Sequence, residues 1–322
     1  MENAISVEHM RRVYKTTTGV IKRKIKEVEA VRDVSFDIKS GELFGLLGPN
    51  GAGKTTTVKM LTTLLIPTSG SATIAGHDVV RDAQIIRSKI GFIFGGERGL
   101  YWRLSAADNL RYFASLYRID PDVAKKRIPY LVDMVGLTGR EDEKIEGYSR
   151  GMKQRVHIAR MLLHDPEILF LDEPSIGLDP VAARELRDVV RNLQSEKKTI
   201  LLTTHYMFEA DTLCDRIAVI NHGTIIALDT PENLKLTVQN LSVIELEVFG
   251  VDDDTISIIR QQPYVQSVSL ENHNQKQALL IQSPQGSEVV SDVLALMENY
   301  KIGRVVVREP TLEDAYVHLV SN

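Results

Sequence analysis

Along the first 232 residues, short apolar runs alternate with stretches of helical periodicity. Residues 43–47, 168–171 and 199–203 form three short, mainly apolar runs, the pattern of strands buried on both faces of a sheet. The stretch from about residue 106 to residue 163 has mostly helical spacing. This alternation predicts an α/β domain over residues 1–232.

Near residue 232 the periodicity changes, and residues 241–322 form a second predicted unit. Ile244, Leu246 and Val248 alternate with other residues, which predicts a strand. A helix, two strands, a helix and a strand are then expected at about residues 255–262, 265–270, 278–282, 288–300 and 304–308, with a last helix at 312–320. The order β-α-β-β-α-β predicts a small α+β domain of the ferredoxin-like type.

Composition narrows the possible partners and compartments. The net charge of −4 over 322 residues argues against nucleic acid as the main partner, because a basic face is the usual footprint. The single cysteine, Cys214, excludes an internal disulfide and is expected to be buried. The N-terminus lacks a signal-peptide pattern, and no apolar run approaches the ~18–20 residues that span a bilayer. Any membrane-spanning part is therefore expected on another chain.

A glycine-rich loop lies between the strand at 43–47 and a helix expected at 55–65. Its sequence matches a phosphate-binding loop in its usual context. Glycines let backbone N–H groups turn toward a phosphate, and the helix N-terminus adds positive potential. We expect Lys54 to reach the β- and γ-phosphates and the Thr55 hydroxyl to bind Mg²⁺. The predicted nucleotide-contacting set of this loop is Gly48, Pro49, Asn50, Gly51, Ala52, Gly53, Lys54, Thr55 and Thr56.

Two carboxylates follow the apolar run at 168–171. Asp172 is placed to hold Mg²⁺, and Glu173 is placed to polarise an attacking water. General-base action of this kind contributes typically ~10²–10⁴-fold. The alternative is two carboxylates in solvent at a strand end, which the neighbouring phosphate loop disfavours.

A second turn suited to anions, Ser149-Arg150-Gly151, opens a helix expected at 152–163. A serine hydroxyl and free N–H groups at a helix N-terminus can bind an anion. An ordinary N-cap serine is the alternative interpretation.

The order of these motifs resembles the nucleotide-binding subunit of ATP-binding cassette (ABC) transporters over about residues 5–232. The resemblance rests on the phosphate loop, the signature at 148–152, Leu-Asp-Glu-Pro at 171–174, the D-loop ending at Asp179, and the switch histidine His205. In that family two cassettes meet head to tail. Each ATP lies between the phosphate loop of one subunit and the signature of the other.

The resemblance implies a P-loop NTPase fold with a parallel-sheet core, an antiparallel β subdomain and a helical subdomain at about residues 97–163. It implies an ATPase that uses Mg²⁺ held by Thr55 and Asp172. Catalysis would rest on Glu173, His205 and Lys54, and the partner's ATP would meet Ser149, Arg150, Gly151 and Met152. Tyr14 matches the family's adenine-stacking aromatic, with a plain strand-face tyrosine as the alternative.

The chain departs from the family pattern in three places. Arg150 stands where the signature has glycine, and it either adds charge at the anion site or points to solvent. Gly95 stands where the family has the Q-loop glutamine that binds Mg²⁺ and senses the membrane partner. Glu97 is a candidate substitute for that glutamine. Trp102 belongs either to a membrane-subunit docking loop or to the core.

The third departure is a basic insertion at residues 15–26, expected as a solvated hairpin tip or as a patch that meets anionic headgroups. Residues 241–322 resemble the C-terminal extension of drug- and antibiotic-exporting cassettes of the ABC-2 type, whose closing motif matches residues 310–316. Dimer support or regulation is the expected role of this extension, and small-molecule sensing is the alternative.

These features predict an ATPase subunit at the cytoplasmic face of the cell membrane. We expect it to pair with a second copy or a homologous cassette and to power a separate integral membrane permease, an exporter of drugs, antibiotics or lipophilic compounds. The alternatives are a soluble ABC ATPase of translation or DNA repair, and a regulator that binds ATP without turnover.

Overall fold

The computed structural model describes residues 3–18, 24–95, 99–238, 240–273 and 276–321. The chain divides into two compact units, Met1–Asp229 and Thr230–Asn322. The sequence places this division slightly later, at 232–241. Glu97 and Lys22-Arg23 of the basic run lie outside the described residues.

The centre of the first unit is a parallel sheet. Neighbouring strands run in the order β9 (Arg216–Asn221), β3 (Leu43–Leu47), β8 (Thr199–Thr204), β7 (Ile168–Asp172) and β6 (Ile90–Phe94). Every residue of β3, β7 and β8 is buried, as expected for strands covered on both faces. The three apolar runs in the sequence are therefore confirmed as neighbouring core strands.

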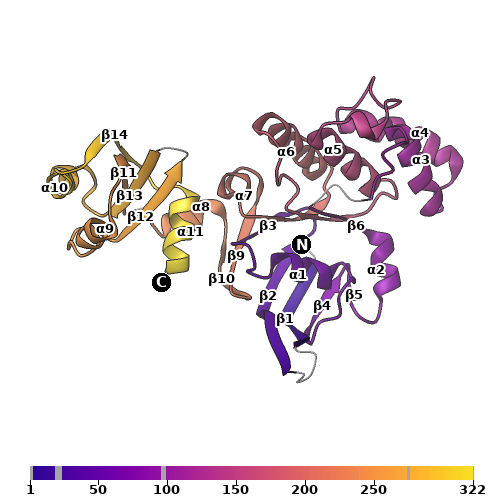
Figure 1. Ribbon diagram of the computed structural model, residues 1–322. Helices are drawn as coiled ribbons and strands as arrows, with labels where there is room; N and C mark the ends of the chain where they lie inside the picture. The colour runs from indigo at the N-terminus through magenta and orange to yellow at the C-terminus, as the bar shows by residue number, and fades with distance from the viewer. Residues whose placement is uncertain (1–2, 19–23, 96–98, 239, 274–275, 322) are drawn as a thin grey trace. The chain divides into compact units, whose positions relative to one another are not determined.

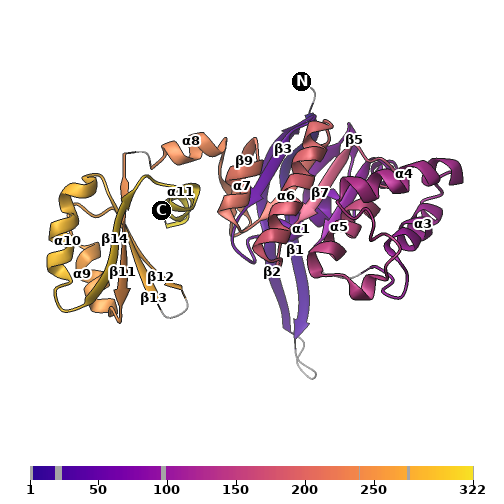
Figure 2. The ribbon, with the colours of Figure 1, turned by 90° about the horizontal axis from the view of Figure 1, so that it is seen from above.

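A mainly antiparallel layer continues this sheet beyond β9. It consists of β10 (Thr224–Asp229), β2 (Lys24–Lys39), β1 (Asn3–Thr18), β4 (Ser69–Ile74) and β5 (His77–Asp78), with a parallel pairing between β10 and β2. β1 and β2 form a long hairpin that projects from the unit (Figure 2). The described residues of the basic insertion, 15–18 and 24–26, therefore lie in the distal part of this hairpin, where Thr18 pairs with Lys24.

Helix α1 (Lys54–Leu61) packs between the parallel and antiparallel layers (Figure 1). Its buried Val58, Met60 and Leu61 belong to one core with residues of both layers. The helix is shorter than the predicted 55–65. It ends where Thr63 adopts a φ of 61°, a left-handed conformation that interrupts helical hydrogen bonding.

The region predicted as a helical subdomain contains α3 (Ala106–Leu116), α4 (Pro121–Met134), the short 3-10 helix η1 (Ile145–Gly147) and α5 (Arg150–Met161). The remaining helices of the first unit are α2 (Ala83–Lys89), α6 (Pro180–Ser195) and α7 (Met207–Leu213). α3, α4 and α5 pack against one another, and α5 also packs against α6 and β6. This packing places the start of α5 beside the segment that precedes α6.

The second unit opens with helix α8 (Pro231–Leu236). It then contains β11 (Ser242–Phe249), α9 (Asp253–Arg260), β12 (Ser267–His273), β13 (Lys276–Ser283), η2 (Gly286–Val289), α10 (Val290–Leu296), β14 (Lys301–Arg308) and α11 (Leu312–Ser321). Its sheet has the order β12-β13-β11-β14, and all its neighbouring strands are antiparallel. α9 and α10 cover one face of this sheet and α11 lies on the other (Figures 1 and 2).

The predicted β-α-β-β-α-β order is present in the second unit, with one correction. The single helix expected at 288–300 is instead a 3-10 turn followed by α10, which ends at Leu296. The residues after it lead directly into β14, whose pairing with β11 begins at Lys301. Strand pairing therefore limits the helix more than local periodicity does. The ferredoxin-like fold type itself stays a prediction.

Candidate functional site

The phosphate loop lies between the end of β3 and the start of α1. A Cβ atom at Gly48 would lie 2.3 Å from the carbonyl oxygen of Ile220, so any larger residue would displace the backbone there. Gly53 has a φ of 110°, and a Cβ on it would lie 2.6 Å from the carbonyl oxygen of Ala30. These two positions require glycine for space, and Gly53 also requires it for its conformation.

The loop borders a cavity of about 240 Å³. Its lining combines backbone from the glycine loop with an ammonium, two hydroxyls and a carboxylate: Ala30, Pro49, Asn50, Gly51, Gly53, Lys54, Thr55, Thr56 and Glu173. Most of the loop residues predicted from the sequence are therefore brought together around one space. Backbone N–H groups at a helix start and a buried ammonium favour an anionic occupant.

Lys54 is buried and its ammonium makes three contacts. It donates hydrogen bonds to the carbonyl oxygens of Gly48 at 2.6 Å and Pro49 at 3.1 Å. It also lies 3.1 Å from Oε1 of Glu173. The cation thus connects the phosphate loop with the acidic strand end, which is where the sequence places the two halves of the site.

Asp172 ends β7 with a buried carboxylate. Thr203 donates to its Oδ1 at 2.6 Å, and Thr55 donates to its Oδ2 at 2.8 Å. Burial raises the pKa of Asp172 above the ordinary aspartate value, and the two hydroxyl donors only partly lower it. Asp172 and Thr55 form an oxygen donor pair of the kind that Mg²⁺ prefers. Thr203 is a site residue that the sequence analysis missed, although Thr203 and Thr204 directly precede the switch histidine.

Glu173 has a φ of 49°, an unusual left-handed conformation for a residue with a Cβ. Its backbone N–H donates to the carbonyl oxygen of Thr203 at 3.0 Å and to its hydroxyl at 3.1 Å. These bonds to β8 stabilise the strained turn, a feature found often at functional sites. The turn directs the Glu173 carboxylate back toward Lys54.

His205 follows β8, and its Nδ1 lies 3.4 Å from Oε2 of Glu173. This nitrogen is buried and makes no hydrogen bond within the described part of the chain. The carboxylate of Glu173 therefore lies between an ammonium and an imidazole. All three predicted catalytic residues meet at one point.

The signature turn lies at the start of α5. Ser149 is the N-cap of this helix, and its hydroxyl accepts a hydrogen bond from the backbone N–H of Met152 at 3.2 Å. The described residues that line the phosphate-loop cavity include no member of the signature turn. Within one chain the turn therefore acts as an ordinary helix cap, and it does not reach the phosphate-loop cavity of its own chain.

Tyr14 is half-buried on β1 and also lies outside the residues that line this cavity. The guanidinium of Arg12 lies 4.9 Å from the centre of its ring. Its adenine-stacking role stays a prediction.

The D-loop residue Asp179 caps α6. Its Oδ1 accepts hydrogen bonds from the backbone N–H groups of Val181 and Ala182, both at 3.0 Å. Side-chain caps of this kind contribute about 1 kcal/mol to helix stability. Asp179 therefore has a structural role within its own chain.

Gly95 follows β6, where the family pattern places a glutamine. A Cβ at this position would meet the carbonyl oxygens of Asp172 and Glu173 and a methyl of Ile176, each at 3.4 Å. These are ordinary contact distances, so packing does not demand glycine here. Glycine therefore supplies no side-chain amide oxygen at this position beside Asp172.

Trp102 is half exposed, so the interpretation as a core anchor is wrong. The ammonium of Lys153 on α5 lies 4.8 Å from the ring centre, and the carbonyl oxygen of Trp102 accepts from the backbone N–H of Glu146. Tyr101 is also about half exposed and hydrogen-bonds through its hydroxyl to Tyr112. The loop therefore presents aromatic surface while its backbone is fixed to the lead-in of the signature.

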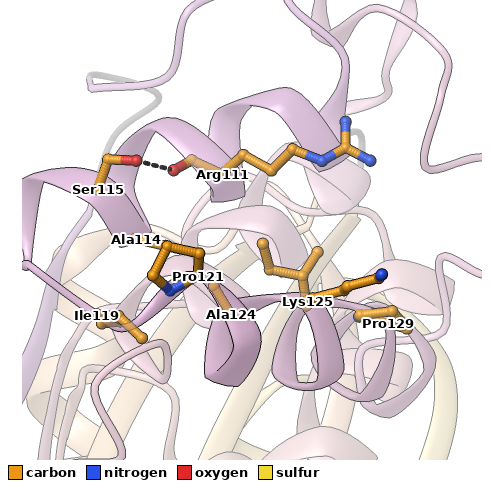
Figure 3. Close-up of a pocket in the computed structure, with 9 residues that line it drawn as sticks. Arg111, Ala114, Ser115, Ile119, Pro121, Ala124, Lys125 and Pro129 are labelled. Carbon is orange, nitrogen blue, oxygen red and sulfur yellow. Dashed lines mark hydrogen bonds between the residues drawn. The ribbon is translucent and has the colours of Figure 1, made fainter.

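A second hollow of about 340 Å³ lies between α3 and α4 (Figure 3). Its floor is aliphatic, with Ala114, Ile119 and Pro121 among its lining residues, and Arg111 and Lys125 supply the charged groups. Ser115 donates its hydroxyl to the carbonyl oxygen of Arg111, which is a bond within the helix. This groove contains none of the predicted site residues.

Comparisons with known proteins identify the relatives of this chain. Residues 31–176 match the ABC transporter family. The chain is 36% identical over 301 residues to the linearmycin resistance ATP-binding protein LnrL of Bacillus subtilis, covering 93% of this chain and 96% of that protein. It is 34% identical over 312 residues to the daunorubicin resistance ATP-binding protein DrrA3 of Streptomyces coeruleorubidus, covering 95% and 96%.

Solved structures give the same result. An ATP-binding subunit of an ABC transporter superposes with a TM-score of 0.60 at 28% identity, covering 73% of this chain and 92% of that one. The dimeric cassette MJ0796, in a post-hydrolysis state bound to ADP and Pi, superposes with a TM-score of 0.61 at 26% identity, covering 70% and 98%. A parallel sheet with a phosphate loop and an acidic strand end defines a P-loop nucleoside triphosphatase. The chain belongs to the ABC transporter family and is an ABC ATPase.

Proposed function

We propose that this protein binds and hydrolyses ATP to power a separately encoded membrane permease that exports drugs, antibiotics or related lipophilic compounds. The observation that carries the ATPase part is the convergence of Lys54, Glu173 and His205 beside the Asp172–Thr55 pair. The export part rests on relatives aligned over nearly their whole length, whose names specify linearmycin and daunorubicin resistance.

The proposed chemistry begins with an exchange of partners at Lys54. Its ammonium lies 3.1 Å from Glu173, and the phosphates of ATP would replace this carboxylate as its counter-ion. Glu173 is then available to take a proton from the attacking water. His205 is placed to donate a hydrogen bond to the γ-phosphate. Thr55 and Asp172 would hold Mg²⁺, which would offset the negative charge of the phosphates.

The signature contributes from a second subunit. Ser149 and Gly151 lie at a helix start, where backbone N–H groups and the helix dipole favour a phosphate. Because this turn does not line the cavity of its own chain, a second copy or a homologous cassette is proposed to receive it. ATP would then hold two cassettes together, and its hydrolysis would release them.

The permease is proposed to dock on the loop around Trp102. Tyr101 and Trp102 are about half exposed, and Leu104 beside them is also exposed. An apolar group of this kind often marks a protein interface. Within the described residues, no helix is long and apolar enough to cross a bilayer. Docking would place this protein at the cytoplasmic face of the membrane.

Substitution Glu173→Gln tests the central role. We expect phosphate release to fall by roughly 10²–10⁴-fold, because the general base is lost, while ATP binding persists. Light scattering should then detect an ATP-bound dimer. Replacing the exposed Glu167 with glutamine is the matched control. Equal hydrolysis by wild type and Glu173→Gln would exclude this role.

A regulator that binds ATP without turnover is the second candidate, and the missing glutamine at Gly95 favours it. Steady-state phosphate release by the wild-type protein with Mg²⁺ discriminates the two. If the wild type releases phosphate and Glu173→Gln does not, the protein is an ATPase. If the wild type releases no phosphate even with the purified permease present, the regulator is supported.

A further inference from the structure

The signature turn and the D-loop of one chain are in direct contact. Arg150 is the first residue of α5, and Gly177 lies in the D-loop with a φ of 71°. A Cβ atom at Gly177 would lie 1.9 Å from Nη1 and 2.5 Å from Cζ of Arg150. The guanidinium therefore covers the backbone of Gly177, and a side chain at that position would have to displace it.

Two further contacts extend this one along α5 and α6. A Cβ atom added at Gly151 would lie 2.6 Å from the Cβ of Ala182 on α6. Farther along, Nη2 of Arg155 lies 3.3 Å from Oε2 of Glu185. The start of α5 is thus packed tightly against the start of α6, and Arg150 extends the contact onto the D-loop.

The sequence alone left two roles open for Arg150, extra charge at the anion site or a side chain in solvent. Arg150 is exposed to solvent, and its guanidinium also lies over the D-loop of its own chain. Arginine suits this position because its planar group can cover a peptide backbone and donate in several directions at once. A glycine at position 150 would leave the D-loop uncovered.

We propose that Arg150 is a positioning residue that holds residues 175–179 against the signature turn of the same chain. This inference rests on the proposed function. The Arg150 contact makes the signature and the D-loop a single rigid element, and the two approach the partner subunit together. Each subunit then presents both segments in one fixed geometry when ATP brings the cassettes together. Arg150 acts on the partner's nucleotide through the D-loop, without contacting the phosphates.

The test is a double-mutant cycle in the Glu173→Gln protein, with Arg150→Ala, Gly177→Ala and the double variant. The readout is the dissociation constant of the ATP-bound dimer, measured by sedimentation equilibrium. Arg150→Ala should weaken the dimer roughly tenfold, because the D-loop is released. Gly177→Ala should weaken it at least as much, because its methyl group displaces the guanidinium and its φ of 71° is strained for alanine. Contacting residues give non-additive effects, so the double variant should be little weaker than Gly177→Ala alone.

Binding of a fluorescent ATP analogue to the monomer should stay within roughly twofold of the parent, since Arg150 does not line the phosphate-loop cavity. Arg150→Lys should restore part of the dimer affinity by retaining the charge and length. Losses that add in the double variant would overturn the proposal, because they would mean that Arg150 acts independently of the D-loop. An unchanged dimer in Arg150→Ala would overturn it as well.

The control is Arg191→Ala, which removes another exposed arginine whose carboxylate partner, Asp188, lies on its own helix. It should leave the dimer unchanged. A Glu173→Gln protein that stays monomeric with ATP would refute the proposed function itself. A dimer that forms normally and ignores Arg150 would refute only this inference.

Discussion

At the scale of single residues, Glu173 makes two contacts that ATP binding would change. Its φ of 49° directs the carboxylate toward Lys54, and His205 lies on its other side. The bonds from its backbone N–H to Thr203 hold this conformation without using the side chain. The carboxylate is therefore positioned by the backbone and remains able to change partner.

The first residue-scale prediction concerns Gly95. Gly95→Gln should add a side-chain amide oxygen to the region beside Asp172, where a Cβ meets only ordinary contacts. We expect the Mg²⁺ concentration needed for half-maximal ATP hydrolysis to fall several-fold. Mg²⁺ titrations of the ATPase rate provide the measurement. Gly95→Ala is the control, since it adds the Cβ without the oxygen, and equal titrations for the two variants would contradict the prediction.

The second residue-scale prediction concerns the buried His157 on α5. Burial, and to a smaller extent the charge of Arg160, lowers the pKa of His157 to about 4. The unfolded chain, with a histidine pKa of about 6.5, takes up a proton that the folded protein excludes. The stabilising contribution is therefore complete above pH 6.5 and is lost as the pH falls toward 4, by about 3 kcal/mol in total.

His157→Leu should remove this dependence. Urea unfolding followed by the fluorescence of Trp102, the single tryptophan, reports on the first unit. The free energy of unfolding of the wild type should fall relative to that of the variant between pH 6.5 and 4. His9→Gln, which changes an exposed histidine, should behave like the wild type. A constant difference across this range would show that His157 does not titrate as expected.

At the scale of elements, the closing motif of the second unit attaches α11 to the sheet. Asp314 is buried and accepts from Arg308 Nη1 at 2.6 Å, from Thr311 N at 2.7 Å and from Thr311 Oγ1 at 2.8 Å. Burial alone would raise the pKa of Asp314, but these donors outweigh it and hold the pKa below the usual value. The motif therefore works as a structural clasp.

Asp314→Ala should destabilise the second unit by about 2 kcal/mol, because it leaves Arg308 and Thr311 without their buried acceptor. Hydrogen exchange of the amides in β11 and β14 measures this change locally. Glu313→Ala, an exposed neighbour on the same helix turn, is the control. Equal protection in the two variants would mean that the clasp contributes little.

The ends of helices and strands also depend on contacts with distant parts of the chain. The helix expected at 288–300 is interrupted because β14 must pair with β11, and the helix expected at 55–65 stops at Leu61, before Thr63. Local periodicity identified these elements, whereas their ends depend on strand register and on single backbone conformations. Such ends are set by partners far away in the sequence.

At the scale of the whole molecule, the chain carries two units with separate hydrophobic cores. All the predicted nucleotide residues lie in the first unit. A protein truncated after Asp229 is expected to bind ATP within about threefold of the full chain, because the cavity and its lining are retained. Loss of the ATP-bound dimer in the truncated Glu173→Gln protein would support a dimer-supporting role for the second unit.

The measurement pairs equilibrium binding of an ATP analogue with the mass of the ATP-bound species by light scattering. A truncated protein that dimerises like the full chain would exclude the dimer-supporting role and leave regulation or small-molecule sensing. Loss of ATP binding itself would show that the first unit needs the second to fold.

The sequence by itself determined the order of the elements and the residues from which the chemistry of the site is predicted. Phosphate loops, acidic strand ends and helix caps are short motifs, and neighbouring residues suffice to specify them. The tertiary structure alone decided which side chains meet across long stretches of chain. Thr203 bonds Asp172 from the next strand, Trp102 lies at the surface, and Arg150 covers Gly177 of the D-loop. Those contacts depend on how strands and helices pack, and local sequence patterns do not encode packing.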